Sequence, residues 1–302
     1  RDIGVTGVQT CALPIYKQLN SLCDDIISEI DSHLLDNQKI SIHSIIYNKL
    51  AFLFLESLFG VIITSQDKKF IEDVGLFNKD KSCDTPLMKL AMINYFGFFL
   101  PRIVRQWLDR DAIDRNRKAD RISEYILKNC SVKKNSLLYD LKEIDLDFDN
   151  LKGECNLILA NANSVAISLQ WAIYAAIKNP HIQDKIIESI DYTKSAYLET
   201  LRMYPVFHLL PYQYKSKCPF AFKKKHYLIS VLATHMSDKN WTNPRKFIPE
   251  RFNDLNLITK GSYIPFGGTS RSCPGAGIAI TIAPIVLKSL RSEEHTSELQ
   301  SR

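Results

Sequence analysis

The residues most able to do chemistry surround one cysteine, Cys273, which stands between a glycine-rich stretch and an apolar segment. Residues 265–269 contain paired glycines, which accept the positive φ that other residues resist, so we predict a tight turn after a short strand. Pro274 suits the first turn of a helix, where its missing N–H needs no partner, and residues 278–290 have helical length and period. We therefore expect Cys273 at or just before a helix N-terminus.

The surroundings of Cys273 favour a metal-binding thiolate. The partial positive charge of a helix N-terminus stabilises an anionic sulfur, and Arg271 adds a full positive charge two residues earlier. Gly275 and Gly277 remove side-chain bulk beside the sulfur, so a large flat group could approach the backbone. Such a sulfur suits the axial ligand of a haem iron. The alternative is a buried free cysteine beside a glycine-rich turn.

Two charged motifs precede the cysteine segment. Glu199 and Arg202 are three residues apart in a predicted helix, so their side chains can meet on one face. Arg251 follows in the sequence Pro-Glu-Arg-Phe, residues 249–252. Taken alone, such pairs are usually solvated at a surface and contribute little.

A polar segment interrupts the longest predicted helix. Residues 160–164 read Ala-Asn-Ala-Asn-Ser, and two asparagines in a helix centre oppose intrinsic propensity. Local conflicts of this kind often mark functional sites. Ser164 has a hydroxyl that can hydrogen-bond, whereas the Asn163 amide does not titrate. The alternative is that these residues only cap or kink a core helix.

The cysteine segment resembles the haem-binding loop of the cytochrome P-450 superfamily, F-x-x-G-x-R-x-C-x-G. Phe266, Arg271, Cys273 and Gly275 match in register, while Thr269 stands where the loop has a glycine. The resemblance implies that Cys273 is the axial ligand of the haem iron. It also implies that Phe266, Arg271 and Gly275 belong to the cofactor-binding loop.

The resemblance extends to the charged motifs. In this family E-x-x-R lies on one helix and P-E-R-F in the following meander, and their side chains form a buried network under the haem. The matching residues are Glu199, Arg202 and Arg251. The resemblance therefore gives them a structural role, in which they hold the meander and the cysteine loop.

Two further segments are similar to family motifs but differ from them at some positions. The polar helix segment is similar to A-G-x-D/E-T, whose acid and alcohol help to deliver protons during oxygen activation. Asn163 and Ser164 stand at those positions, so they are the candidate catalytic residues, with water in place of a direct carboxylate relay. Tyr212 falls where many members have an arginine that contacts a haem propionate, and it keeps one hydrogen-bonding group.

The implied fold is mainly α, a cytochrome P-450-like fold truncated at both ends, with a small β component and a long central helix. The implied activity is that of a haem-thiolate monooxygenase with haem b, which activates O2 to oxidise a small apolar organic substrate. Electrons would come from NAD(P)H through an electron-donor protein, either a ferredoxin or a flavoprotein reductase. No nucleic-acid partner is expected.

Two alternatives remain open. One is a haem-thiolate peroxygenase, or an isomerase or dehydratase, which needs no external electrons; Asn163 in place of an acid favours it slightly. The other is a non-catalytic, decayed fragment, which the departures at Asn161, Tyr212 and Thr269 keep open.

The two ends of the chain look foreign to a gene. Codons can be chosen for residues 5–15 and 291–301 so that the two DNA strings are reverse complements over nearly their whole length. This is typical of sequencing-adapter read-through. We therefore expect residues 1–15 and 291–302 to be non-native, and residues 16–290 to form a partial haem domain.

The composition fits a globular protein of 302 residues with 45% hydrophobic residues and a formal net charge of +6. The cysteines outside residues 1–15 are scattered without a C-x-x-C pair, which argues against a zinc site or a disulfide framework. We find no stretch of the ~20 apolar residues that cross a bilayer, and residues 50–64 are predicted to form a buried helix. Cytoplasmic and membrane-associated locations both stay open.

Periodicity predicts a mostly helical chain. The expected helices are residues 17–35, 44–59, 70–76, 87–107, 112–129, 137–144, 150–178, 181–189, 193–204 and a last helix from Pro274. The expected short strands are residues 40–42, 212–214, 221–223 and 227–229, and a helical turn is expected at 231–236.

Overall fold

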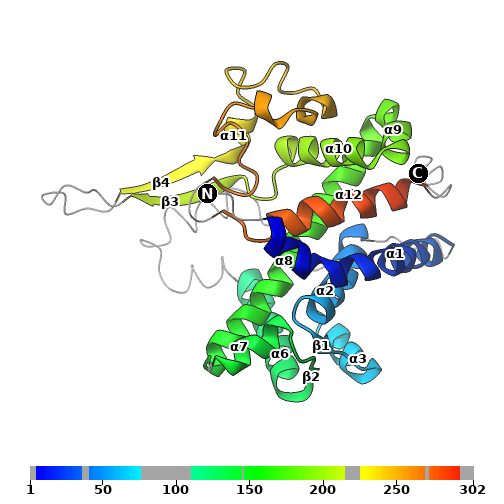
Figure 1. Cartoon of the computed structure of the whole chain (residues 1–302), viewed down its shortest axis with the longest axis vertical. Coiled ribbons are helices and arrows are strands. Elements are labelled where there is room, and N and C mark those ends of the chain that lie inside the picture. The colour runs from blue at the N-terminus through cyan, green and yellow to red at the C-terminus, as the bar shows by residue number, and fades with distance from the viewer. Residues whose placement is uncertain are drawn as a thin grey trace, which may run out of the picture. The chain divides into compact units, whose positions relative to one another are not determined.

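The computed structural model describes residues 5–35, 41–75, 110–144, 146–214, 225–268 and 272–292. It is mainly helical, with two small antiparallel sheets and a long helix, α8, so the predicted fold class is confirmed (Figure 1). The chain divides into two compact units. Unit 1 comprises Arg1–Asp31 and Ser164–Arg302, and unit 2 comprises Ser32–Asn163.

In chain order, the helices and strands are α1 (Val5–Leu35), α2 (Ile42–Ser57), β1 (Val61–Ile62), α3 (Ser65–Asp73), α6 (Arg110–Asn129), β2 (Ser131–Val132), α7 (Leu137–Glu143), α8 (Phe148–Lys178), η2 (Pro180–Ile182), α9 (Gln183–Glu188), α10 (Ile190–Met203), β3 (Leu209–Tyr214), β4 (Lys225–Ser230), α11 (Val231–His235), η3 (Pro249–Phe252), η4 (Leu255–Leu257) and α12 (Ala276–Ser292).

Unit 2 is organised around α2, whose residues from Leu50 to Leu55 are all buried. Ser41 caps this helix by accepting a hydrogen bond from the Ser44 N–H. β1 and β2 pair in antiparallel register beyond the helix. Thr64 and Asp67 then form a capping box that starts α3, because each side chain accepts a hydrogen bond from the other residue's backbone N–H.

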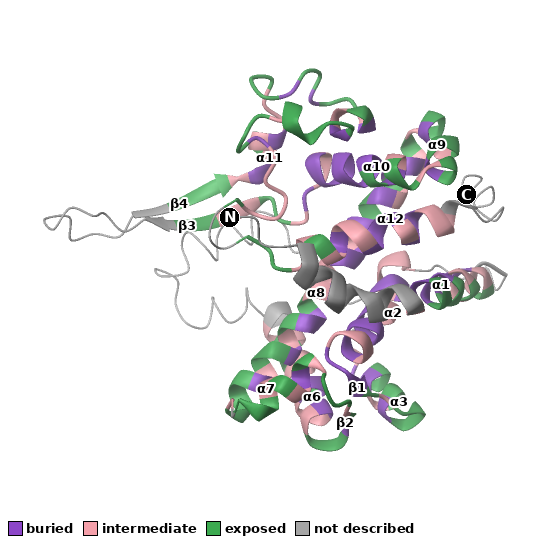
Figure 2. Cartoon of the chain, in the orientation of Figure 1, coloured by how far each residue is buried: buried purple, intermediate pink, exposed green. Residues whose placement is uncertain are grey.

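Unit 1 is organised around α10, which packs against α9, α12 and η3. Every residue from Ser195 to Arg202 is buried, and Figure 2 shows most of the helix in the colour of buried residues. β3 and β4 form an antiparallel hairpin in which Tyr212 lies opposite Tyr227. Apolar side chains from α10 and from the irregular segment after α11 form a small core, with members Leu198, Trp241 and Phe252.

α8 is one helix that is long and apolar enough, by length and composition, to cross a membrane. The expectation that no segment meets this criterion is therefore wrong, because the polar residues in the middle of α8 are uncharged. The most apolar window of α8 is 44% buried, and core helices of globular proteins pass the same test. The predicted buried helix at residues 50–64 is confirmed only as far as Ser57, where α2 ends.

Most predicted helices are confirmed, and the differences lie at their ends. Ile42 is helical rather than part of a strand, because Ser41 caps α2 there. The helix predicted from residue 70 begins at Ser65, because its capping box lies earlier. The last helix begins at Ala276 instead of Pro274, which lies in a turn. The elements predicted at residues 87–107 and 221–223 lie outside the described residues.

Candidate functional site

The cysteine loop, residues 264–268 and 272–275 in the described chain, is held by its own backbone. The Cys273 N–H donates to the Phe266 carbonyl at 2.8 Å, and the Gly267 N–H donates to the Ile264 carbonyl at 3.1 Å. Gly267 has φ +80°, so the predicted glycine-dependent turn is confirmed. The predicted short strand before it is reduced to a single bridge between Pro265 and Gly267. α12 begins three residues after the cysteine, as expected for a thiol near a helix N-terminus.

Cys273 differs from the other cysteines that the structure describes, because it alone is exposed. Burial raises the pKa of the Cys130 thiol to about 11 and that of the Cys155 thiol to about 12. Cys23 is also buried, and its pKa is raised for the same reason. The buried thiols are therefore neutral and inaccessible, whereas Cys273 is exposed.

The donor set around Cys273 fits a haem better than a bare metal ion. The described chain contains no group of three or more His, Cys, Asp or Glu side chains that could hold a metal ion. A haem needs only one protein ligand here, because the porphyrin supplies the equatorial nitrogens. Among the described atoms, a Cβ built on Gly275 would come within 4 Å of the Cys273 Sγ alone, at 3.8 Å, so the described residues leave room beside the sulfur.

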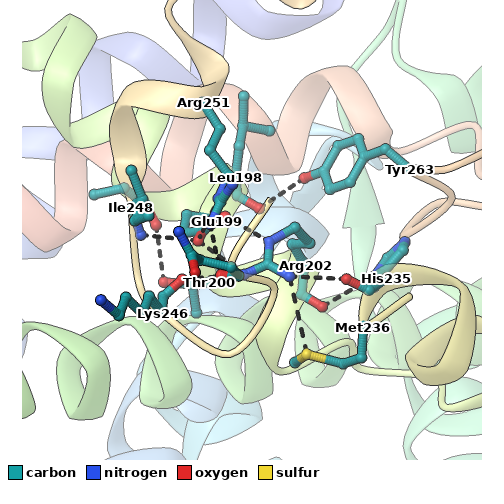
Figure 3. A network of polar contacts seen from close by, with 12 residues as sticks. Leu198, Glu199, Thr200, Arg202, His235, Met236, Lys246, Ile248, Arg251 and Tyr263 are labelled. Carbon is teal, nitrogen blue, oxygen red and sulfur yellow. Dashed lines mark hydrogen bonds and ion pairs between the residues drawn. The ribbon is translucent and has the colours of Figure 1, made fainter. Parts of the chain in front are cut away.

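A buried charge network lies on the C-terminal half of α10 (Figure 3). Arg202 donates from Nε to Glu199 Oε2 at 2.7 Å and from Nη2 to Oε1 at 2.9 Å. Both side chains are 0% exposed. This is the bidentate geometry in which a guanidinium and a carboxylate interact most strongly. We call Glu199, Arg202 and Arg251 the charge network.

The charge network extends from α10 to the segment before the cysteine loop. Glu199 Oε1 also accepts from the Ile248 N–H at 2.9 Å and from Arg251 Nε at 3.4 Å. Arg251 Nη2 donates to the Asn243 carbonyl at 2.8 Å. The residues are therefore brought together as predicted, and they join α10 to η3 and to the irregular residues just before it.

Arg202 has further partners on α11 and on the residues that follow it. Its Nη1 donates to the His235 carbonyl at 2.8 Å, and its Nη2 lies 3.4 Å from the Lys246 carbonyl. Its guanidinium also lies 5.2 Å from the ring centroid of Trp241. These contacts offset the desolvation of a charge that has no access to solvent.

The polar segment of α8 makes a contact that the sequence did not predict. His43 Nε2 lies 2.9 Å from Asn163 Oδ1, so the imidazole donates to the amide oxygen within unit 2. Burial lowers the pKa of His43, and the hydrogen bond to Asn163 opposes that shift. Ser164 is the next residue of α8 and is partly buried. Asn163 therefore has a titratable neighbour although its own side chain does not titrate.

Comparison with known proteins agrees with this geometry. The profile of the family described as Cytochrome P-450 matches residues 23–290. The chain belongs to the cytochrome P-450 family. Proteins of this family use haem b as cofactor.

Two cytochrome P-450 relatives are hydroxylases by name. The chain is 28% identical over 235 residues to strychnine-10-hydroxylase of Strychnos nux-vomica, and this alignment covers 61% of this chain and 45% of that protein. It is 26% identical over 273 residues to germacrene A acid 8-beta-hydroxylase of Helianthus annuus, and this alignment covers 75% of this chain and 53% of that protein. The chain thus spans about half of the length of these relatives.

The remaining predicted cofactor residues of this cytochrome P-450 chain are only partly placed. Tyr212 lies on β3 and is 41% exposed. Arg271 and Thr269 lie outside the described residues. The role of Tyr212 at a haem propionate stays a prediction.

Three side chains near the charge network were missed by sequence reasoning. His235 and Tyr263 contact α10 through hydrogen bonds to the Arg202 and Leu198 carbonyls. The Tyr197 hydroxyl lies 2.8 Å from Ser168 Oγ in the buried interior of unit 1. The only signal in the sequence is a histidine and two tyrosines in otherwise apolar surroundings, which does not reveal their partners.

Proposed function

We propose that the whole protein is a haem-thiolate monooxygenase that hydroxylates an apolar organic substrate. The observation that carries this proposal is Cys273, the one exposed residue among the described cysteines, which lies three residues before α12 in a chain of the cytochrome P-450 family. Its two hydroxylase relatives support the reaction type, although the named substrates belong to those proteins.

Cys273 would hold the haem iron through its sulfur, with Phe266 and Gly275 beside it in the cysteine loop. A bound haem with a thiolate ligand supplies the electron donation that favours O–O cleavage. One oxygen atom of O2 enters the substrate and the other leaves as water, so electrons and protons must be supplied. The electrons would come from NAD(P)H through an electron-donor protein, a ferredoxin or a flavoprotein reductase.

Ser164 and Asn163 are the candidate residues for proton delivery. The Ser164 hydroxyl both donates and accepts hydrogen bonds, so it can hold a water molecule or pass a proton. His43 donates to Asn163 Oδ1 at 2.9 Å, which fixes the orientation of the Asn163 amide. The amide nitrogen then remains as a hydrogen-bond donor. His43 is the nearby group that can exchange a proton in place of an acid.

A second candidate reaction uses no external electrons. The observation that favours it is Asn163, which replaces a titratable side chain with an amide. In that case the whole protein would act as a peroxygenase or as an isomerase or dehydratase. Ser164 keeps the hydroxyl that the monooxygenase reaction uses, so we place this candidate second.

The two reactions are separated by supplying electrons in two ways. The whole, haem-loaded protein is incubated with strychnine or germacrene A acid, the compounds named for two relatives, and product formation is followed by mass spectrometry. We expect hydroxylated product, or NADPH consumption that depends on the added compound, with NADPH and a reductase. Product with hydrogen peroxide alone would favour the second candidate, and Cys273→Ser should abolish activity in either case.

A further inference from the structure

His235 is a buried histidine that is hydrogen-bonded at both ring nitrogens. It ends α11 and its side chain is 0% exposed. Nδ1 lies 3.0 Å from the Arg202 carbonyl oxygen on α10, and Nε2 lies 2.8 Å from the backbone nitrogen of Ile264. A single side chain therefore joins the helix of the charge network to the first residue of the cysteine loop.

The two partners fix the protonation state of His235. A carbonyl oxygen only accepts, so Nδ1 must carry the proton that it donates to Arg202. The Ile264 N–H only donates, so Nε2 must offer its lone pair. An imidazolium carries N–H groups at both positions and could not accept the Ile264 bond. The contact with Ile264 therefore requires a neutral ring with its hydrogen on Nδ1.

Ile264 is connected to Cys273 by backbone hydrogen bonds within the cysteine loop. The Ile264 carbonyl accepts from the Gly267 N–H, and the Phe266 carbonyl accepts from the Cys273 N–H. A path of backbone hydrogen bonds thus runs from His235 through the turn to the residue that bears the thiol. Since the loop has no regular secondary structure, its position depends on such anchors.

Tyr263 makes a second, parallel connection. Its ring stacks on His235 with centroids 5.4 Å apart and an interplanar angle of 27°. Its hydroxyl donates to the Leu198 carbonyl at 2.9 Å (Figure 3). The start of the cysteine loop is therefore attached to α10 at two successive turns of that helix.

We propose that neutral His235 is a positioning residue for Cys273, because it fixes the start of the cysteine loop against α10 by accepting the Ile264 N–H while it donates to the Arg202 carbonyl. This rests on the proposed role of Cys273 as the haem ligand. His235 touches neither the thiol nor a substrate, so it acts through the backbone.

The charges around His235 support the neutral state. Burial, the strongest influence, lowers its pKa to about 4, the hydrogen bond to the Arg202 backbone raises it, and the Arg202 charge lowers it. Arg202 and Arg251 both pair with Glu199, so the Glu199 charge is already neutralised by these partners. Tyr263 is the titratable group stacked on the ring, and burial raises its pKa well above the ordinary value, so it stays neutral.

Two substitutions separate the roles of the two ring nitrogens. An asparagine amide reaches about as far as Nδ1, so His235→Asn can keep the bond to Arg202 but leaves the Ile264 N–H without an acceptor. A glutamine amide reaches about as far as Nε2, so His235→Gln can still accept from Ile264. Both variants keep one of two hydrogen bonds, so a purely stabilising histidine predicts similar behaviour for both. His181→Gln, at an exposed histidine, is the matched control.

The first measurement is amide hydrogen exchange at Ile264 in the whole protein, which needs no catalytic activity. We expect His235→Asn to lower protection there by roughly tenfold, the effect of losing one hydrogen bond, while His235→Gln and His181→Gln stay near wild type. Equal protection in wild type and His235→Asn, or equal loss in both His235 variants, would overturn the proposal.

The second measurement is the reduced-CO spectrum of the haem-loaded protein. We expect His235→Asn to lose thiolate-type Soret absorption to the band of a neutral thiol ligand, whereas His235→Gln retains it. A wild-type protein without any thiolate band would refute the proposed function, while the exchange result at Ile264 would still decide whether His235 anchors the loop.

A third measurement uses the unaltered protein, so it tests the proposal even if the His235 variants do not fold. Selective ¹⁵N labelling of histidine reports which ring nitrogen carries hydrogen. We expect a buried histidine with Nδ1 protonated and Nε2 bare at neutral pH. A signal from His235 with Nε2 protonated would contradict the proposal without any substitution.

Discussion

The charge network and the cysteine loop both belong to unit 1, yet they are held in opposite ways. Glu199 and Arg202 are 0% exposed, and their charged atoms are bonded to each other and to backbone groups of a second segment. Cys273 is exposed, and its loop is held by backbone hydrogen bonds to the Phe266 and Ile264 carbonyls and by the bond that the Ile264 N–H donates to His235 Nε2. The network is thus held by buried side-chain charges, whereas the cysteine loop is held mainly by its backbone.

This difference follows from what each region must do. A bidentate ion pair is directional and, once buried, tolerates few alternative arrangements. As the proposed ligand of a large cofactor, Cys273 must instead stay accessible, so it cannot be fixed by surrounding its side chain. His235 and Tyr263 connect the two regions, because each bonds α10 and borders the start of the loop. Substitutions in the charge network and substitutions in the cysteine loop should therefore change different measured properties of the protein.

The largest loss of stability is expected from Glu199→Gln. The change leaves the buried Arg202 without its negative partner, which costs about 3–5 kcal/mol of unfolding free energy. Glu250→Gln is the matched control, because Glu250 pairs with Lys185 where both side chains are about half exposed, and such a pair contributes at most about 1 kcal/mol. Urea denaturation of the whole protein measures both. Equal effects of the two substitutions would show that the network does not support the fold.

The next effect is a dependence of stability on pH that comes from His235. Its pKa is about 4 when folded against an ordinary value of 6.5, so the unfolded chain takes up the proton first as the pH falls. The His235 contribution is therefore complete above pH 6.5 and is lost as the pH falls towards 4, a change of about 3 kcal/mol. Denaturation across this window should show a steeper slope in wild type than in His235→Gln. His43, whose pKa is also lowered, contributes equally to both proteins and cancels.

A smaller effect is expected from Arg251→Lys. Arg251 is 12% exposed and reaches Glu199 at 3.4 Å and the Asn243 carbonyl at 2.8 Å with different nitrogens. Lysine keeps the charge but has no planar fork to reach both partners, so we expect a loss of about 1.5 kcal/mol. Arg202→Lys should cost more, because Arg202 is fully buried and bonds Glu199 twice. The reverse order in urea denaturation would contradict this ranking.

The smallest effect is expected from Tyr197→Phe, which tests the contact of α10 with Ser168 of α8. The change removes the 2.8 Å contact between the Tyr197 hydroxyl and Ser168 Oγ. The Ser168 hydroxyl still donates to the Val165 carbonyl. We expect a loss of about 1 kcal/mol, the net value of one hydrogen bond, with no change in the reduced-CO spectrum. A spectral change would mean that Tyr197 also positions the cysteine loop.

The sequence predicts the Glu199–Arg202 pair and the turn before Cys273 because both depend on local spacing, whereas Arg251, 52 residues from Glu199, was assigned to the charge network only from the family resemblance. Glu199 and Arg202 meet since they are one helical turn apart, and the turn before Cys273 depends on a glycine with positive φ at residue 267. The helices were also predicted from periodicity, with errors where a cap, such as Ser41 or Thr64, sets the true start. These features are encoded by residues within a few positions of each other.

The features that sequence reasoning missed depend on contacts between distant segments. His43 and Asn163 are 120 residues apart, and His235 bonds Ile264 across 29 residues. A histidine in a short apolar helix gives no indication of which backbone groups it will meet. Such pairings arise only when tertiary packing brings the segments together, so they become visible in the structure alone.

The role of Cys273 as the haem ligand is decided by the reduced-CO spectrum of the whole, haem-loaded protein compared with that of its Cys273→Ser variant. Serine has nearly the same size but cannot provide a thiolate ligand. We predict a Soret band at the position of thiolate-ligated haem in wild type, and its complete loss in Cys273→Ser with the fold retained by circular dichroism. The same thiolate band in both proteins would contradict the assignment.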